Sequence, residues 1–429
     1  MSRHLPTTVP PGGGSGQPWN RQRLRSNNEW LLLELLRTGG PSSRAQLARD
    51  TGLSKPTVSA ALAALEQAGL VREAGRFVPE RGRTAVLYEP DPTAGHVLGV
   101  DIGRARLRVA VADLAGRIVA RRDVPNGGRT ANAVADAVVA AARETTAEAG
   151  LAPAEIVHAV IGTPGVWDEE RRGVRYATSL PGWGRPGLFD RIGDGLETAV
   201  TVGNDANLAA LGEFTLGAGR GSRMFAYLLI GTGLGVGMVK DGELLSGAHG
   251  AAGEVGLVPL PPRPDGEPGG TIEQATAADA VVRTAHELGM TGQLTAKQVF
   301  DAARAGDPLA TEAVHREAGQ LAYAVAVLSA VLDPDLVVLG GGLGSSADLL
   351  LEPLERALQR LTPLRPRLAP SELGEEVVLL GAVATALDIA RPEVFGRRTL
   401  SVGGTSVGLR MDRPPGYRWC CEGERSRDR

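Results

Sequence analysis

Four polar side chains stand where they could hold the hydroxyl groups of a ligand. Asn204 and Asp205 lie in "VGNDANLAALGEF", after a run typical of a strand and before a run typical of a helix. Glu254 lies among glycines and alanines in "AAGEVGL", where other atoms can approach its carboxylate closely, and Glu273 lies in "GGTIEQAT". Ionised carboxylates accept hydrogen bonds from hydroxyl groups and can also take a proton from them. These residue types therefore suit a ligand rich in hydroxyl groups.

A purely structural role is the alternative for these residues. Asp and Asn that precede a helix commonly serve as its N-cap, so Asn204 and Asp205 could do no more than that. A glutamate in the first turn, as expected for Glu273, is stabilised by the helix dipole even where it faces water. The short motifs leave both interpretations open, and the surrounding sequence has to decide between them.

Two similar Gly-rich turns indicate a pair of related lobes. The stretch "VDIGRARLRVAVADLAG" (100–116) carries Asp101 and Gly103 into a tight turn between two expected strands. The stretch "LLIGTGLGVGMVKDGEL" (228–244) repeats this pattern, with Gly231, Thr232 and Gly233 in the turn. Two such hairpins, each at the start of an α/β unit, predict two lobes that close on a cleft.

The first turn departs from what a phosphate-binding loop needs. Such a loop uses glycines so that backbone amides can approach phosphate, and a hydroxyl group adds a further donor. Gly103 is instead followed by Arg104 and Ala105, whereas the second turn and Gly341 in "LGGGL" keep their glycines. This argues against ATP binding, although Arg104 could itself pair with an anion, so nucleotide binding stays open.

The body of the chain reads as an α/β fold. From residue 96 onward, strand-like runs alternate with Ala-rich helical runs such as 131–148, and this alternation is typical of α/β domains. After residue 390 the pattern fades, which predicts a disordered tail. The expected strands are 97–102, 107–112, 156–162, 200–203, 224–230, 234–240, 336–339 and 377–380.

The first 90 residues form a basic head on an acidic body. They hold 12 Arg and Lys against 7 Asp and Glu, while the whole chain of 429 residues has a formal net charge of -3. In "SRAQLARDTGLSKPTVSAALAALEQAGLV" (43–71), Ser43 and Ser54 can cap two helices, and Gly52 supplies the turn between them. Val58, Leu62 and Leu65 then form the buried stripe of the second helix. This pattern predicts a helix-turn-helix.

The outer face of that second helix is slim enough for the major groove of DNA. Two further strands follow around a basic tip, which predicts a wing that contacts phosphates or the minor groove. A helical hairpin used for protein contacts is the alternative. The residues expected to contact DNA are Ser54, Lys55, Pro56, Thr57, Ser59 and Ala60 on the helix and Arg81 and Arg83 on the wing.

Composition gives the expected domain limits and compartment. We expect a disordered arm at 1–26, a winged helix-turn-helix at 27–90, a linker at 91–95, an α/β body at 96–393 and a disordered tail at 394–429. The two cysteines, Cys420 and Cys421, are adjacent and offer no disulfide framework, and no apolar run reaches the length of a membrane span. A cytoplasmic location without membrane contact is therefore expected.

The series of motifs resembles the ROK family (repressors, open reading frames and kinases), in its branch of NagC/XylR-type regulators. The resemblance covers about 27–391. It rests on the winged helix-turn-helix followed in order by "VLGVDIG", "GTPGVWD", "LPGWG", "GNDANLAALGE", "GTGLGVG", "GAAGEVGL" and "DPDLVVLGGGL". An ordered series of this kind is specific, whereas a single Gly-rich loop is weak.

The resemblance implies a two-lobed, actin-like ATPase (sugar kinase) fold with a sugar site in the cleft, commonly in homo-oligomers. Asp205 matches the base that takes a proton from a sugar hydroxyl in the family's kinases, and Glu273 matches another sugar-binding acid. Gly165 in "GTPGVWD" would lie in the sugar-side loop. Trp183 could stack on the ligand or pack between the lobes.

Three departures from the family pattern matter. The sequence "DIGRA" replaces the kinases' "DIGGT", and Leu257 stands where the family has a histidine that ligates zinc. The family's Cys-x-Cys-Gly-x-x-Gly-Cys segment is also absent, since 260–273 contains no cysteine. Structural zinc needs about four nitrogen or sulfur ligands. No zinc, and no other metal or cofactor, is therefore expected.

The leading hypothesis is a sugar-responsive transcriptional regulator, a repressor of carbohydrate-use genes whose kinase-like domain senses rather than catalyses. It would act as a homodimer or dimer of dimers on an inverted-repeat operator in double-stranded DNA. One alternative is an ATP-dependent sugar kinase with an appended DNA-binding domain, supported by Asp205 and the second Gly-rich turn. Another is a regulator that has lost its sugar response and answers to a protein partner.

Overall fold

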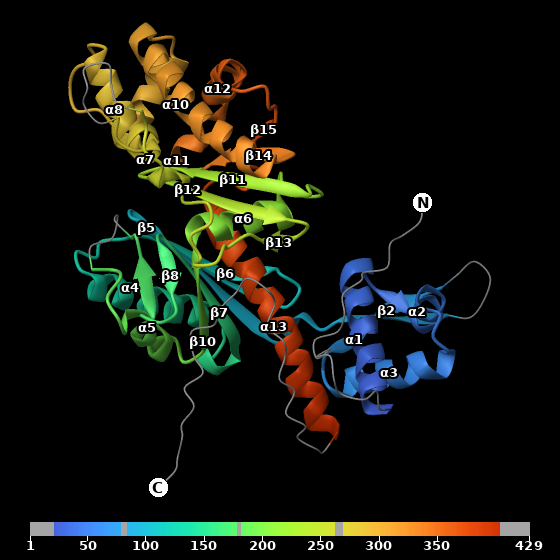
Figure 1. Ribbon diagram of the computed structural model, residues 1–429. Helices are drawn as coiled ribbons and strands as arrows, with labels where there is room; N and C mark the ends of the chain where they lie inside the picture. Colours follow the sequence, from blue (N-terminus) through green and yellow to red (C-terminus); the bar gives the residue numbers. More distant parts are fainter. Residues whose placement is uncertain (1–20, 79–83, 178–181, 262–268, 404–429) are drawn as a thin grey trace.

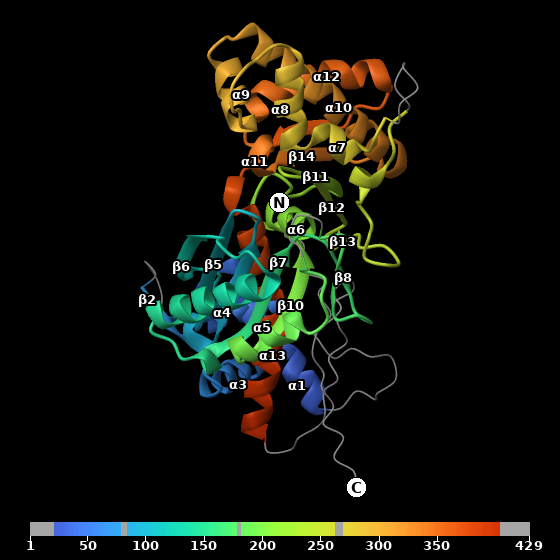
Figure 2. The same cartoon turned by 90° about the vertical axis from the view of Figure 1, so that its left-hand side faces the viewer.

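The computed structural model describes residues 21–78, 84–177, 182–261 and 269–403. Figure 1 shows three parts, namely a small N-terminal head and two stacked lobes, each of which is built around its own sheet. The long helix α13 (Val377–Gly403) starts between the lobes and ends beside the head, as both views show (Figures 1 and 2). No helix among the described residues is long and apolar enough to cross a membrane.

The head folds as the local sequence signals predict. The hydroxyl of Ser43 accepts a hydrogen bond from Gln46 N at the start of α2, and Ser54 accepts one from Thr57 N at the start of α3. Gly52 closes α2 with φ 70°, a conformation that favours glycine. The head contains α1 (Arg21–Gly39), β1 (Ser42–Ser43), α2 (Arg44–Thr51), α3 (Lys55–Gln67), β2 (Val71–Phe77) and β3 (Ala85–Pro90), with its sheet in the order β1-β3-β2.

The first lobe contains a five-stranded sheet in the order β10-β7-β4-β5-β6. Strands β4 and β5 form an antiparallel hairpin, and β7 and β10 add in parallel. The elements are β4 (His96–Ile102), β5 (Arg106–Asp113), β6 (Ile118–Pro125), α4 (Ala131–Glu148), η2 (Pro153–Glu155), β7 (Ile156–Thr163), the small pair β8 (Val166–Asp168) and β9 (Gly173–Arg175), α5 (Leu188–Leu196), β10 (Ala199–Asn204) and α6 (Asp205–Leu216).

The second lobe repeats this architecture, with its sheet in the order β13-β12-β11-β14-β15. The antiparallel hairpin β11–β12 corresponds to β4–β5, and the parallel neighbour β14 corresponds to β7. The two-fold repeat predicted from the Gly-rich turns is thus confirmed. The elements are β11 (Met224–Ile230), β12 (Leu234–Lys240), β13 (Glu243–Leu244), η3 (Val255–Leu257), α7 (Ile272–Thr276), α8 (Ala278–Glu287), α9 (Ala296–Arg304), α10 (Pro308–Leu332), β14 (Leu336–Gly340), α11 (Gly341–Gly344), α12 (Ala347–Leu361), β15 (Arg367–Pro370) and η4 (Gly374–Glu376).

Helices α6 and α13 form the layer between the two sheets. One buried cluster contains apolar residues of both helices together with residues of β4, β5, β7, β11, β12 and β14. The two helices approach each other closely at Gly212 and Gly381, because a Cβ on Gly381 would lie 1.9 Å from the carbonyl oxygen of Leu208. The backbones of the two helices are therefore in contact there, so a movement of α6 toward α13 would displace α13.

Four boundaries differ from the sequence predictions. The run 377–380 is the start of α13 and not a strand, and the expected tail at 394–429 is wrong through Gly403, where α13 ends. The expected arm at 1–26 is wrong from Arg21, where α1 starts. The linker 91–95 is a packed element, since η1 (Pro92–Ala94) buries both Pro92 and Ala94. The remaining expected strands are confirmed, with ends shifted by a residue or two.

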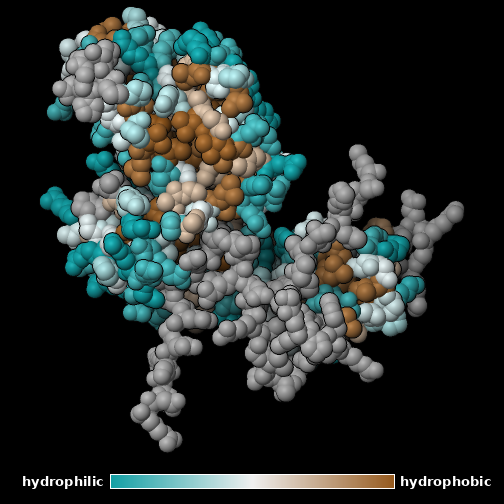
Figure 3. Space-filling model, in the orientation of Figure 1, coloured by the Kyte–Doolittle hydropathy of each residue, from teal (hydrophilic) through white to brown (hydrophobic). Residues whose placement is uncertain are grey.

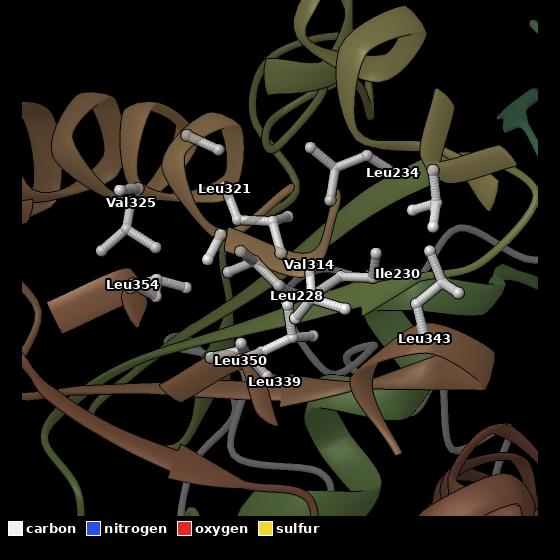
Figure 4. Packing of buried hydrophobic residues seen from close by; sticks show 14 of the residues in the cluster. Leu228, Ile230, Leu234, Val314, Leu321, Val325, Leu339, Leu343, Leu350 and Leu354 are labelled. Atoms are coloured by element: carbon white, nitrogen blue, oxygen red, sulfur yellow. The ribbon is translucent and has the colours of Figure 1, made fainter. Parts of the chain in front are cut away.

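The largely apolar core of the second lobe contains a buried acid on α10. Leu228, Leu321 and Leu354 pack together there (Figure 4). Glu317 of the same helix is 3% exposed, and its Oε1 has no hydrogen-bond partner among the described residues. Burial raises the pKa of Glu317 well above its usual range, although the guanidinium of Arg283 favours the charged form.

Replacing Glu317 with methionine should stabilise the protein at high pH. The folded chain keeps this carboxyl neutral, whereas the unfolded chain ionises it above its ordinary pKa. The contribution of the Glu317 carboxyl to the free energy of unfolding is therefore complete below the pKa of the unfolded chain, and it is lost as the pH rises above that value toward the raised pKa of the folded chain. We expect Glu317→Met to raise the melting temperature by several degrees at pH 8 and by less at pH 5. Glu312→Gln, at an exposed position of α10, is the control, and an equal effect of Glu317→Met at both pH values would contradict the interpretation.

Candidate functional site

The end of β10 and the start of α6 carry the first two predicted ligand-binding residues. Asn204 is the N-cap of α6, because its Oδ1 accepts a hydrogen bond from Asn207 N at 3.0 Å. Its Nδ2 donates to Gly165 O at 3.2 Å, which ties the cap to the neighbouring loop. Asp205 is not the cap, and its carboxylate accepts a hydrogen bond from its neighbour Ala206 N. The structural alternative therefore applies to Asn204, while Asp205 keeps acceptor capacity for a ligand.

The environment of Asp205 disfavours its charged form. Burial raises the pKa of Asp205 to about 6, although hydrogen bonds from the backbone amides of Ala206 and of Asp205 itself lower it. A carboxylate with this pKa changes charge close to neutral pH. Such shifts are typical of functional sites, where a desolvated acid stands ready to bind or take a proton.

The loop after β7 requires glycine at position 165. Gly165 has φ 96°, and a Cβ there would lie 2.6 Å from the carbonyl oxygen of Arg175. Trp183, the other predicted contact on this side, is 1% exposed and packs edge-on against Phe189 at 5.4 Å. Its indole Nε1 donates to Thr163 Oγ1 at 2.6 Å. Trp183 thus belongs to the core of the first lobe, which is neither the ligand contact nor the packing between the lobes that was considered for it.

The two predicted glutamates lie on the second lobe and face the first. Glu273 lies on α7, and its Oε2 accepts a hydrogen bond from Leu234 N at 3.2 Å. Glu254 immediately precedes η3, and burial raises its pKa, with further increases from the carboxylates of Asp205 and Glu273. Glu254 of the second lobe thus lies within electrostatic reach of both Asp205 of the first lobe and Glu273. That these carboxylates bind a ligand stays a prediction.

The first Gly-rich turn holds a charge network that the sequence analysis did not anticipate. Asp101 lies opposite Arg108 in the β4–β5 hairpin, and Arg108 Nη1 donates to Asp101 Oδ2 at 3.1 Å. Arg108 Nη2 donates to Glu375 Oε2 at 3.0 Å, which connects the hairpin to η4. Burial raises the pKa of Asp101 to about 6, although Arg108 lowers it and Asp205 adds to the increase. The cross-strand register of the hairpin was the available signal for this pair.

The tip of that turn is closed by its own backbone. Gly103 N donates to Arg106 O at 2.9 Å, and the side-chain amide of Asn126 donates to Gly103 O at 2.8 Å. Arg104 and Ala105 are exposed at the tip. The side chains of these two residues therefore occupy the positions from which a second glycine and a hydroxyl would serve a phosphate.

The remaining predicted loop residues lie together on the second lobe. Gly341 has φ 82°, and a Cβ there would lie 2.5 Å from the carbonyl oxygen of Ile230, the residue before Gly231. Gly231 N donates to Gly233 O at 3.0 Å, which closes the turn. Thr232 of the same turn lines a cavity of about 500 Å³ next to Glu273. The structure thus brings Gly231, Thr232, Gly233 and Gly341 to one end of the β11–β14 pair.

The predicted DNA-contacting residues lie at the start of α3. Lys55, Pro56 and Ala60 are exposed, while Thr57 and Ser59 are half-buried. The hydroxyl of Ser54 is used in the cap and also lies 2.8 Å from Thr57 Oγ1. Strands β2 and β3 form the predicted wing, but Arg81 and Arg83 at its tip lie outside the described residues.

Among the described residues, no three His, Cys, Asp or Glu side chains are grouped so that they could hold a metal ion. Leu257, which stands where the resemblance would put a zinc-ligating histidine, is 53% exposed. Half of the segment 260–273, which lacks the expected cysteines, lies outside the described residues, namely 262–268.

Family models divide the chain as its fold does. The model of the ROK family matches residues 97–389, and the model of the MarR family matches residues 25–83. The first match covers both lobes, and the second covers most of the head.

Curated relatives include kinases and repressors. A glucokinase of Streptomyces coelicolor is 30% identical over 69% of this chain and 98% of its own length. A xylose repressor of Caldicellulosiruptor bescii is 24% identical over 86% of this chain and 97% of its own length. The alignment with the kinase is about as long as the two lobes together, while the alignment with the repressor is long enough to include the head.

Solved structures divide in the same way. A ROK-family glucokinase of Streptomyces griseus in complex with glucose and AMPPNP is 30% identical and covers 69% of this chain and 99% of its own, with a TM-score of 0.59. A ROK-family transcriptional regulator described as a homolog of the E. coli MLC protein covers 88% of this chain and 99% of its own, with a TM-score of 0.71 at 21% identity. The latter match concerns the fold alone.

Proposed function

The chain belongs to the ROK family and carries a MarR-type winged helix head, and from this premise we propose that it is a sugar-responsive repressor of transcription. The lobes bind a sugar and transfer no phosphate, and the head binds double-stranded DNA. The observation that carries this proposal is that one long helix, α13, contacts both the helix that begins at Asp205 and the head.

The sugar lies between the lobes, where its hydroxyl groups donate to Asp205, Glu254 and Glu273. These carboxylates come from different lobes, so a sugar held by all three fixes the angle between the lobes. The hydrogen bond of 3.2 Å from Asn204 Nδ2 to Gly165 O holds the loop after β7 beside these carboxylates. A sugar that binds one arrangement of the lobes more tightly than another shifts the population toward the arrangement that it binds more tightly.

Helix α13 transmits the lobe angle to the head. Its first half packs on α6 at Gly381, and its second half places Val394 and Phe395 in the hydrophobic core of the head. The rings of Phe395 and Trp30 lie 5.0 Å apart, edge to face. A tilt of α13 therefore moves the head relative to the lobes, and in an oligomer it changes the spacing of the recognition helices.

A homo-oligomer presents two copies of α3 about one DNA turn, roughly 34 Å, apart to an inverted repeat. An uncovered apolar surface on α10 supports such an assembly. Ala330 and Val331 are exposed near the end of this helix, Val331 by 77%, and Val327 beside them is half-buried. Figure 3 shows apolar side chains gathered on the upper lobe, in the region where Figure 1 labels α10 and α11. A solvent-facing helix surface is ordinarily polar.

The test uses duplexes that the purified protein selects from a random pool, and then a panel of monosaccharides. We expect the selected duplexes to contain an inverted repeat and one sugar to change the affinity for them at least tenfold.

Lys55→Gln should weaken DNA binding and reduce the slope of log affinity against log salt by about 1. Ala60→Glu should abolish binding, while the same change at exposed Ala147 of α4 should leave it intact. Selection of no duplex would refute the proposal.

A sugar kinase with an appended head is the second candidate, favoured by the glucokinases that are 30–32% identical to this chain. Asp205 would then be the base, and the loops at Gly231 and Gly341 would hold nucleotide. Arg104 and Ala105 oppose this function, because phosphoryl transfer needs a nucleotide held in line with the acceptor oxygen. ADP release that depends on a sugar, and that Asp205→Asn abolishes, would establish the kinase.

We further propose that the protein holds no zinc and needs no cofactor. The proposal rests on Leu257 and on the absence of cysteine from 260–273. Metal analysis of the purified protein should find less than one zinc in ten chains. One tightly held zinc per chain would refute it.

A further inference from the structure

A cavity of about 310 Å³ lies at the joint between the head and the lobes. We call it the joint cavity. Its walls come from α1, the segment 89–94, the turn between β5 and β6, and α13. Leu33, Leu36 and Leu70 line it from the head, while Leu114 and Val394 line it from the lobes and α13. It shares no lining residue with the carboxylate site, so the sugar proposal does not account for it.

The acids of the joint cavity are already satisfied. Glu34 pairs with Arg37 at 2.7 Å, and Glu89 pairs with Arg72 at 2.8 Å. Asp91 accepts hydrogen bonds from the backbone amide and the hydroxyl of Thr93.

Arg391 is different from the other arginines that line the cavity. Its Nε and Nη2 both donate to Leu114 O at 3.1 Å, while Nη1 makes no hydrogen bond among the described residues. The nearest carboxylate, that of Asp388, lies 4.0 Å from Nη1. Burial lowers the pKa of Arg391, and the neighbouring guanidinium of Arg37 lowers it further, while the carboxylates of Asp388, Glu34 and Asp113 raise it. The cavity therefore combines apolar walls with a guanidinium nitrogen, Arg391 Nη1, that makes no hydrogen bond among the described residues.

We propose that the joint cavity binds a small amphipathic carboxylate. The hydrocarbon part lies against Leu33, Leu114 and Val394, and the carboxylate accepts a hydrogen bond from Arg391 Nη1. A volume of about 310 Å³ lies at the lower end of the range for small-molecule pockets, which suits a small carboxylate such as octanoate. A charged hydrogen bond in a largely apolar pocket is the usual basis for recognition of such a ligand.

Occupation of the joint cavity would hold the head in one orientation, because the ligand touches the head, the lobes and α13 together. It would thus act on DNA affinity separately from the sugar, and this regulatory part rests on the proposed function. The binding part does not depend on it.

Calorimetry of the full-length protein with octanoate tests the site, with 1-hexanol as the uncharged probe. We expect octanoate to bind saturably, once per chain, and at least tenfold more tightly than 1-hexanol. Arg391→Met should weaken octanoate binding at least tenfold. Ala115→Trp should have the same effect, because exposed Ala115 lines the cavity and an indole there would take up space that the ligand needs. Arg117→Met, at a lining arginine paired with Asp113 at 2.8 Å, is the matched control and should bind within about twofold of the wild type.

The proposed site would be overturned if octanoate and 1-hexanol bound with equal affinity. It would also be overturned if neither Arg391→Met nor Ala115→Trp weakened octanoate binding. A second measurement follows operator binding with and without octanoate. We expect a change of at least fivefold in the wild type and none in Ala115→Trp. An unchanged operator affinity with octanoate bound would overturn the regulatory part alone. A protein that binds no DNA at all would refute the proposed function. The calorimetric test of the joint cavity does not depend on DNA binding and would still decide whether octanoate binds there.

Discussion

Asp205→Asn should lose most of the affinity for sugar and at the same time melt at a higher temperature. Asparagine has nearly the same volume, but it lacks the negative charge that sugar hydroxyls donate to. Hydrogen bonds to charged groups contribute about 1.5–3 kcal/mol, so the dissociation constant for the effector sugar should rise about 10- to 100-fold. Calorimetry with the sugar found in the panel measures this change.

The same variant gains stability because burial raises the pKa of Asp205 to about 6 in the folded chain. The contribution of this group to stability is complete below its unfolded pKa and is lost as the pH rises through about 6. Asparagine never ionises, so we expect Asp205→Asn to melt higher than the wild type at pH 8 and about equally at pH 4. Loss of sugar binding together with a gain in stability would separate a binding role from a folding defect.

The pH dependence of sugar binding gives an independent check. Sugar affinity of the wild type should fall as the pH drops from 7.5 to 5, because Asp205 becomes protonated near pH 6. The affinity of Asp205→Asn, already low, should stay flat over this range apart from any effect of Glu254. Asp136→Asn, at an exposed ion pair on α4, is the matched control. A sugar affinity that Asp205→Asn leaves unchanged would remove Asp205 from the site.

Local sequence signals were sufficient for the head and for most of the two sheets. Ser43, Gly52 and Ser54 act within a few residues of themselves, so their roles as caps and as a turn could be predicted without the rest of the fold. The repeated Gly-rich turns likewise predicted two similar sheets, because each turn sets the register of its own hairpin. The candidate site rests on the same kind of motif, since Asp205 lies between a predicted strand and a predicted helix, whereas no helix or strand was predicted at Glu254.

Helix α13 shows why the remainder could not be predicted. Residues 377–380 are all apolar, and a short apolar run does not distinguish a buried strand from a buried helix. Pro392 lies inside the helix, although proline removes a backbone donor and disfavours helix before it. The helix nevertheless continues, since Val394 and Phe395 beyond the proline are buried in the core of the head. Packing against a distant part of the chain outweighed the local signal.

The role of Arg398 was equally invisible in the sequence, because its partners lie about 330 residues away. Its Nη1 donates to the carbonyl oxygens of Ala68 and Gly69 at 3.3 and 3.1 Å, and its Nη2 donates to Ala94 O. Gly69 has φ 64°, and a Cβ there would lie 2.8 Å from Arg398 Nη1. The guanidinium thus holds the end of the recognition helix α3 and the linker at once.

Arg398→Met should therefore uncouple DNA binding from sugar while leaving both binding sites intact. Methionine keeps the length and the apolar contacts of the stem but cannot donate to the three carbonyl oxygens. We expect the at least tenfold effect of the sugar on operator affinity to fall below about twofold. Sugar affinity itself should stay within about twofold of the wild type. Operator binding by fluorescence anisotropy, with and without sugar, measures this response.

Phe395→Ala should uncouple the head from the lobes more strongly than Arg398→Met does. It removes the ring that packs on Trp30 and leaves a cavity in the core of the head. Loss of a buried phenylalanine costs about 3–5 kcal/mol, so the head should melt separately from the lobes in a calorimetric scan. Arg316→Met, at an exposed ion pair on α10, is the control for Arg398→Met. A sugar response that survives in both Arg398→Met and Phe395→Ala would show that the lobes reach the head by another route, such as the packed linker at Pro92 and Ala94.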